Sequence, residues 1–346
     1  MPKPDSTQSN STQPEKQANA VQANAVQADT VQADTVQANT VQANTAQAPV
    51  SATKPDHKQL PDTPPLGLWG SAWQNLRYRP LFWVSAFIIL LSIAVAAFPS
   101  LFTSVDPTAA NLRDSLAPAR EGHPMGFTQQ GYDVYARVIY GARASVIVGI
   151  GVTLAVTVVG IILGAIAGYL GGWVDAVLSR ITDMFFAIPL ILAGIVLMQL
   201  FTERTIWSVV FVLAAFGWPQ MARVVRSSVI SVKNEEYVTA SKALGLSNTG
   251  ILFRHVLPNC LAPVIVMATT SLGIYIVAEA TLSYLGIGLP TTTVSWGNDI
   301  SVAQQVLRQA PSNLFWPALA LAITVLGFIL MGDALKDSLD PKERRR

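Results

Sequence analysis

Six long apolar segments separated by polar stretches dominate the chain after residue 65. A helix that crosses about 30 Å of hydrocarbon at 1.5 Å per residue needs roughly 20 apolar residues, so each segment is long enough to span a bilayer. The pattern predicts an all-α, polytopic membrane protein with about six transmembrane helices. Because only residues 202–204 separate the third and fourth segments, five or seven spans also remain open. The six segments cover residues 81–98, 144–170, 184–201, 205–222, 261–285 and 314–332.

The pattern before residue 66 is different. Residues 21–45 repeat a five-residue unit five times, in the forms VQANA, VQADT and VQANT. A period of five matches neither the helix nor the strand, and lone small apolar side chains bury too little area to offset chain entropy. We therefore expect a disordered, low-complexity tail over residues 1–65 and a transmembrane domain over residues 66–341.

The distribution of Lys and Arg predicts the orientation of the spans. With the amino terminus inside, 13 of these residues flank the spans on the cytoplasmic side and six lie on the other side. Four of the six lie in one long loop, residues 99–143, where the bias counts least. The sequence thus predicts a cytoplasmic tail, both termini in the cytoplasm and an extracytoplasmic loop over residues 99–143.

The composition excludes several classes of protein. Hydrophobic residues make up 51% of the chain and charged residues 13%, with a net charge of +2, so we expect membrane lipid and no nucleic acid as a partner. Cys260 is the single cysteine, and three scattered histidines form no metal cluster. Because the chain also contains no G-x-x-x-x-G-K-[ST] phosphate loop, we expect no catalytic, cofactor or metal site and no enzymatic activity.

A polar segment of about 38 residues, 223–260, separates the fourth and fifth spans, whereas 2 to 8 residues usually join neighbouring helices. Its first part has the spacing of a short helix with one apolar face, followed by a glycine suited to a left-handed cap. The residues that we expect to open this helix, form its face and cap it are Glu236, Tyr237, Ala240, Leu244 and Gly245.

The second part of the same segment predicts another short helix. Ser247 can cap its amino end, the helix runs through Arg254, and Pro258 marks its end before the next span. Two short helices at a sharp angle form a compact basic knob that suits a groove on a partner protein. The alternative is an amphipathic hairpin that lies on anionic lipid headgroups.

Several motifs resemble those of ABC importer permeases, specifically the oligopeptide and dipeptide importer family. Residues 237–245 (YVTASKALG) and 251–259 (ILFRHVLPN) resemble the EAA loop of that family, and the spacing from Ala240 to Gly245 to Pro258 is the specific part. Further similarity lies at residues 123–126, 131–145, 278–288 and 296–297, so that residues 70–341 are covered. Four positions depart from the family pattern, namely Phe127, Tyr132, Thr239 and Ser241.

The resemblance implies a type I importer permease in the cytoplasmic membrane of a bacterium, carrying dipeptides or oligopeptides. It implies four partners: a second, homologous permease subunit, two cytoplasmic ABC ATPase subunits and an extracytoplasmic solute-binding protein. Alternatives are a permease for nickel or another small solute, a secondary transporter, and a non-transporting membrane scaffold. The residues that would couple to the ATPases are Glu236, Tyr237, Ala240, Leu244, Gly245, Arg254 and Pro258.

Glu279 is the one carboxylate deep in a predicted span, where a charge costs roughly 2.5 to 3.5 kcal/mol. It is a candidate pathway or gate residue that faces the bundle interior, or else a residue near the outer interface. In the second span, Gly160, Gly164 and Gly168 recur every four residues, which predicts close packing against another helix.

Overall fold

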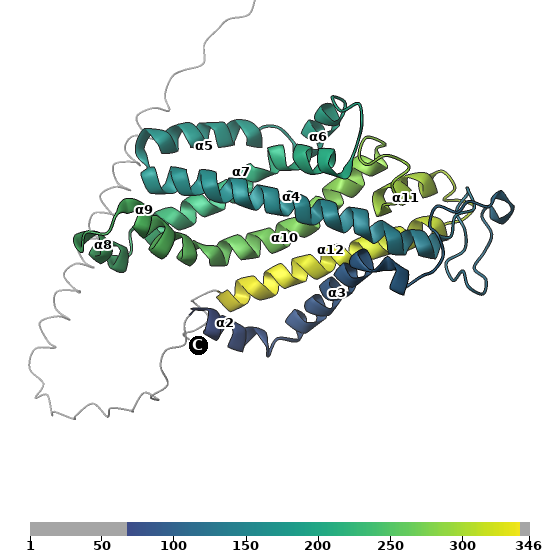
Figure 1. Ribbon diagram of the computed structural model, residues 1–346, viewed down its shortest axis with the longest axis horizontal. Coiled ribbons are helices and arrows are strands. Elements are labelled where there is room, and N and C mark those ends of the chain that lie inside the picture. Colours follow the sequence, from purple (N-terminus) through teal and green to yellow (C-terminus); the bar gives the residue numbers. More distant parts are fainter. Residues whose placement is uncertain (1–67, 340–346) are drawn as a thin grey trace, which may run out of the picture. The chain divides into compact units, whose positions relative to one another are not determined.

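The computed structural model describes residues 68–339, so the predicted tail over residues 1–65 lies outside the described residues. The described part is built from helices, joined by short 3₁₀ turns and loops (Figure 1). In chain order the helices are α2 (Leu68–Leu76), α3 (Pro80–Ala97), α4 (Val134–Leu170), α5 (Gly172–Phe186), α6 (Leu190–Met198), α7 (Ile206–Lys233), α8 (Glu236–Ala243), α9 (Asn248–Ile251), the π-helical turn η3 (Leu252–Val256), α10 (Leu257–Tyr284), α11 (Trp296–Gln304) and α12 (Ser312–Leu339).

Five helical runs within residues 68–339 are long and apolar enough to cross a membrane, or six if α5 and α6 together form one span. The prediction of about six spans is confirmed in that sense. The third predicted span, residues 184–201, is corrected: the helix pair that could form it starts at Gly172, in α5, and α6 is bent by 77° relative to α5. Pro189 precedes α6, and proline both lacks an N–H donor and disfavours helical geometry at Ile188 before it.

Two of the spanning helices extend well beyond their apolar segments. α4 begins at Val134, ten residues earlier than predicted, because the Asp133 side chain caps it by accepting a hydrogen bond from the Ala136 N–H at 2.6 Å. α7 continues to Lys233, so the first eleven residues of segment 223–260 are helical. Hydropathy locates the length of chain that fits in hydrocarbon, whereas a helix ends where its caps lie.

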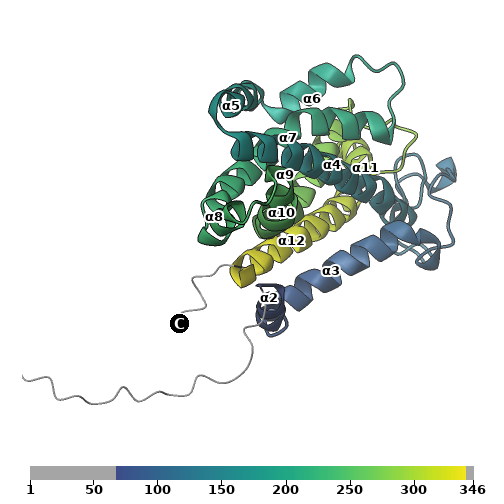
Figure 2. The same cartoon turned by 60° about the vertical axis from the view of Figure 1, so that its left-hand side comes forward.

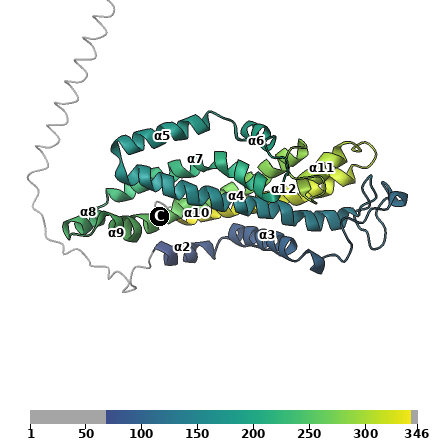
Figure 3. The same ribbon diagram turned by 45° about the horizontal axis from the view of Figure 1, so that its top comes forward.

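The glycines of α4 allow α7 to approach its backbone closely, as predicted. A Cβ atom added at Gly164 would lie 2.5 Å from the carbonyl oxygen of Ala222, and one at Gly168 would lie 2.8 Å from that of Arg226. α4 and α7 run side by side in Figures 1 and 3 and form the most extensive helix pair of the described residues. Their contact forms the centre of the core, which includes Val156 and Val225.

The bundle has two distinct ends (Figure 1). One end carries α8, α9 and η3, which we call the α8–α9 segment (residues 234–256). The other, which we call the loop end, carries residues 98–133 and α11. α11 is fixed there by the Trp296 indole, whose Nε1–H donates to the carbonyl oxygen of Val138 on α4 at 2.9 Å. α2 and α3 pack along α12, as Figure 2 shows.

Candidate functional site

The turn between α8 and α9 has the backbone geometry predicted for Gly245. Its φ is +83°, in the left-handed region that glycine adopts at low cost. No atom lies within 4 Å of the position that a Cβ would occupy, so the requirement for glycine comes from backbone conformation rather than from lack of space.

The α8–α9 segment has one buried face and one exposed apolar face. Val238 and Ile251 are completely buried and belong to the main core of the bundle. Tyr237 is 43% exposed and Leu244 is 81% exposed, and Phe253 of η3 is exposed as well. The predicted residues Glu236, Ala240, Arg254 and Pro258 are also exposed. The segment is thus anchored on one side while its other side packs against no other part of the described chain.

Hydrogen bonds to the end of α4 hold the segment and the residue just before it in place. The Tyr169 hydroxyl of α4 donates to the carbonyl oxygen of Asn248 at 2.9 Å. Lys233, the last residue of α7, donates through Nζ to the carbonyl oxygens of Gly168 and Tyr169 at 3.2 and 3.1 Å. A cation suits this position because the carbonyl end of a helix carries partial negative charge.

The second short helix begins as predicted but does not end as predicted. The Ser247 side chain caps it by accepting a hydrogen bond from the Gly250 N–H at 3.2 Å. The chain then passes through η3 directly into α10, so that one helical run extends over Asn248–Tyr284. Pro258 therefore lies inside a continuous helix, and the wider π-helical turn just before it accommodates a residue that cannot donate to the preceding turn.

Glu279 lies in the interior of the helix bundle, near the end of α10 that faces the loop end. It is completely buried. Ser145 of α4 donates to its Oε2 at 2.9 Å, and Ser283 donates to its Oε1 at 2.8 Å. The Ser283 hydroxyl in turn accepts the Leu289 N–H at 3.1 Å. Glu279 thus links α4, α10 and the turn after α10, and its predicted role in a pathway or gate stays a prediction.

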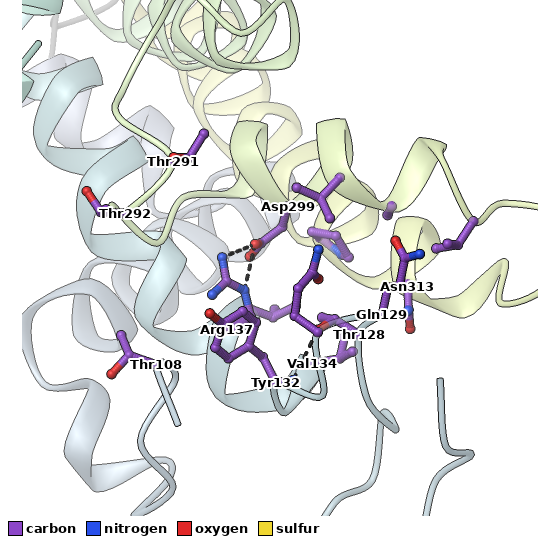
Figure 4. A pocket seen from close by; sticks show the side chains of 16 residues that line it. Thr108, Thr128, Gln129, Tyr132, Val134, Arg137, Thr291, Thr292, Asp299 and Asn313 are labelled. Atoms are coloured by element: carbon purple, nitrogen blue, oxygen red, sulfur yellow. Dashed lines mark hydrogen bonds and ion pairs between the residues drawn. The ribbon is translucent and has the colours of Figure 1, made fainter. Parts of the chain in front are cut away.

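A cavity of about 450 Å³ opens at the loop end (Figure 4), and we call it the loop-end cavity. Its walls come from the loop before α4, the first turns of α4, the turn after α10, α11 and the start of α12. Val138, Val302 and Val306 contribute apolar surface. The polar side chains around it include Thr108, Thr128, Gln129, Thr291, Thr292 and Asn313.

An ion pair between α4 and α11 lies in the wall of this cavity. Arg137 donates through Nε to Oδ1 of Asp299 at 2.7 Å, and its Nη2 lies 2.5 Å from the same oxygen. Arg137 also donates to the carbonyl oxygen of Pro107 at 3.3 Å and stacks over the Tyr132 ring. Oδ2 of Asp299 is buried and has no hydrogen-bond partner among the described residues.

The electrostatics of Asp299 combine two opposing effects. Burial raises the pKa of Asp299 above its ordinary value, and the charge and hydrogen bond of Arg137 offset only part of that rise. Sequence reasoning did not bring this pair together, because 162 positions separate the two residues. The available signal was the similarity at Trp296 and Gly297, which stand three and two positions before Asp299.

His123 lies in the loop before α4, with Nδ1 2.6 Å from Oδ2 of Asp133. No group of three or more His, Cys, Asp or Glu side chains in residues 68–339 could hold a metal ion.

Comparison with known proteins identifies two matching families. Residues 160–345 match the family described as binding-protein-dependent transport system inner membrane component. Residues 67–119 match the N-terminal TM domain of oligopeptide transport permease C.

Curated relatives cover most of the chain. The oligopeptide transport system permease protein OppC of Bacillus subtilis (strain 168) is 35% identical over 81% of this chain and 92% of its own length. The dipeptide transport system permease protein DppC of Alkalihalophilus pseudofirmus is 35% identical over 84% of this chain and 97% of its own. The glutathione transport system permease protein GsiD of Salmonella typhimurium is 36% identical over 85% of this chain and 94% of its own length.

Proposed function

This chain belongs to the binding-protein-dependent transport system inner membrane component family, and on that premise we propose that it imports peptides. It is a membrane permease of an ABC importer. The cargo assignment is supported by the names of similar permeases, which specify oligopeptides, dipeptides and glutathione.

The proposal includes partner subunits that complete the pathway, deliver the peptide and hydrolyse ATP. A second, homologous permease subunit completes the translocation pathway, a solute-binding protein delivers the peptide, and two ATPase subunits supply the energy. The loop end then faces away from the cytoplasm, while both termini and the α8–α9 segment face the cytoplasm. The distribution of Lys and Arg supports this orientation.

The exposed apolar face of the α8–α9 segment is the observation that carries the coupling role. Leu244 is 81% exposed although Val238, six residues earlier, is completely buried. A short, anchored helix that leaves large apolar side chains unpacked is suited to enter a groove on a partner. We assign docking of the ATPases to this face, with Tyr237, Ala240 and Leu244 in contact and Gly245 setting the turn.

One pair of variants tests this assignment. Leu244→Asp places a charge on the proposed docking face, where an unpaired buried charge is costly. Leu112→Asp makes the same change at a leucine that is 77% exposed at the loop end. We expect Leu244→Asp, but not Leu112→Asp, to reduce both copurification of the ATPases and peptide uptake at equal permease abundance. Normal uptake and normal copurification with Leu244→Asp would remove the coupling role from this segment.

A further inference from the structure

The last turn of α4 contacts the chain on both sides of the turn between α8 and α9. Lys233, the residue just before the α8–α9 segment, donates through Nζ to the carbonyl oxygens of Gly168 and Tyr169 at 3.2 and 3.1 Å. Asn248, the first residue of α9, accepts a hydrogen bond from the Tyr169 hydroxyl at 2.9 Å. The end of α4 is therefore tied both to the residue where the chain enters the segment and to the helix through which it leaves.

The packing around these hydrogen bonds fixes their geometry. The Tyr169 ring packs against the main core, which holds its hydroxyl in position. A Cβ atom added at Gly168 would lie 2.8 Å from the carbonyl oxygen of Arg226, so the backbones of α4 and α7 stay close up to this turn. The ammonium group of Lys233 pairs with carbonyl oxygens in the last turn of a helix, which lack intrahelical N–H partners. The segment therefore cannot shift relative to α4 without losing these hydrogen bonds.

α4 continues from this turn to the loop end, where it is tied to other helices again (Figure 1). Ser145 of α4 donates to Glu279 of α10 at 2.9 Å, and the Val138 carbonyl oxygen accepts the indole N–H of Trp296 in α11. The 37 residues of α4 span about 55 Å at 1.5 Å per residue. α4 thus connects the α8–α9 segment with the loop end by a second route, beside the route through η3 and α10.

We propose that Tyr169 and Lys233 are positioning residues that make α4 move together with the α8–α9 segment. A displacement of the segment by the ATPases then reaches the loop end through α4 as well as through α10. The inference rests on the proposed function, which assigns docking of the ATPases to this segment. It gives the end of α4 a part in coupling, although α4 does not belong to the docking face.

The assembled importer, reconstituted in proteoliposomes with its solute-binding protein, allows peptide uptake and ATP hydrolysis to be measured in one sample. We would use radiolabelled trialanine as the probe and determine the amount of peptide imported per ATP hydrolysed. Tyr169→Phe removes only the hydroxyl. We expect this ratio to fall about fivefold, which is the factor that corresponds to one hydrogen bond of ordinary net strength.

Two substitutions of Lys233 test the other contact. Lys233→Met removes the ammonium group and both of its hydrogen bonds but keeps an unbranched side chain, so the ratio should fall at least as far as in Tyr169→Phe. Lys233→Arg keeps a cation with several N–H donors and should restore the ratio.

The matched control lies at the other end of the same helix. Tyr135→Phe removes a hydroxyl that donates to the carbonyl oxygen of Phe102 at 3.2 Å, and it should leave the ratio unchanged. ATPase copurification and the thermal midpoint should stay near the wild-type values in all of these variants. The reason is that Val238 and Ile251, both completely buried, still anchor the segment in the core.

The possible outcomes separate this inference from the proposed function. An unchanged ratio in Tyr169→Phe or in Lys233→Met would overturn the inference, and so would an equal fall in Tyr135→Phe. A loss of uptake that follows a lower thermal midpoint or a loss of the ATPases would also overturn it, because the two residues would then be merely structural. A wild-type complex that neither imports trialanine nor retains ATPases would refute the proposed function, and the inference with it.

Discussion

The hydroxyl of Ser145 on α4 donates a hydrogen bond to the carboxylate of Glu279 on α10 across 2.9 Å, with both side chains completely buried. The bond joins two helices that are 134 residues apart in sequence at that point. Together with the bond from Ser283, it satisfies both oxygens of a carboxyl group that has no cationic partner among its hydrogen bonds.

Replacement of Glu279 should therefore destabilise the bundle in a graded manner. Glu279→Ala leaves the hydroxyls of Ser145 and Ser283 without their acceptor and opens a cavity, for which we expect a loss of about 2 to 4 kcal/mol. Glu279→Gln keeps the size and one acceptor, so it should lose less. The thermal midpoint of the purified permease measures both, with Glu121→Ala, at an exposed loop position, as the control. An unchanged midpoint for Glu279→Ala would contradict a structural contribution.

The close approach of α4 and α7 makes a second prediction. Gly164→Ala would place a methyl group 2.5 Å from a backbone oxygen of α7, which must move away. We expect a loss of roughly 1 to 3 kcal/mol, as for other overpacked sites. Gly273→Ala is the matched control, since its nearest contact would be 3.3 Å. The thermal midpoint of Gly164→Ala should be lower than that of Gly273→Ala. The reverse order would contradict a destabilising contact between α4 and α7 at this position.

Gly245 provides a third prediction, because its left-handed backbone penalises a β-branched residue. Gly245→Val should leave the spans inserted yet weaken ATPase copurification and uncouple ATP hydrolysis from peptide uptake. Gly122→Val imposes the same kind of strain at the loop end, where φ is +78° and no atom lies within 4 Å of the added Cβ. Coupled uptake should survive in that control. Equal behaviour of the two variants would argue against a special role for the α8–α9 turn.

The orientation of the chain is open to a labelling experiment. Ser115, Ser247 and Ser312 are exposed, and the native Cys260 is only 1% exposed. Cysteines introduced at positions 115 and 312 should react with an impermeant maleimide in intact cells, whereas one at position 247 should react only after permeabilisation. Labelling at position 247 in intact cells would invert the predicted topology.

The sequence could predict features that depend on local chemistry. Residues spaced by four along one helix sufficed to predict the glycine face of α4, and the left-handed turn at Gly245 followed from its place between two short helices. Pro189 is the residue in the sequence that indicates the bend between α5 and α6. Hydropathy alone predicts one straight span there, because it measures the length and apolarity of a segment and not the direction of its helix axis. Pro258 led to the opposite error. The sequence predicted a helix end at this residue, whereas the π-helical turn before it lets the helix continue.

The loop-end cavity could not be predicted in the same way. Its ion pair joins residues from α4 and α11, and α11 has only nine residues and no long apolar run. Arg137 and Asp299 become neighbours only when Trp296 fixes α11 against α4. Such a contact depends on tertiary packing, which a single sequence does not encode in any local pattern.

The uninterrupted run over Asn248–Tyr284 has a mechanical consequence. Its 37 residues at 1.5 Å per residue give a rod about 55 Å long. One end of the run is part of the α8–α9 segment, and the other end leads into the turn that Ser283 and Glu279 hold. For a rigid rod of this length, a tilt of about 5° at one end would displace the other end by roughly 5 Å. The π-helical turn η3 lies near the α8–α9 end of this run, so a tilt applied at that end would reach the loop end only if η3 stays rigid.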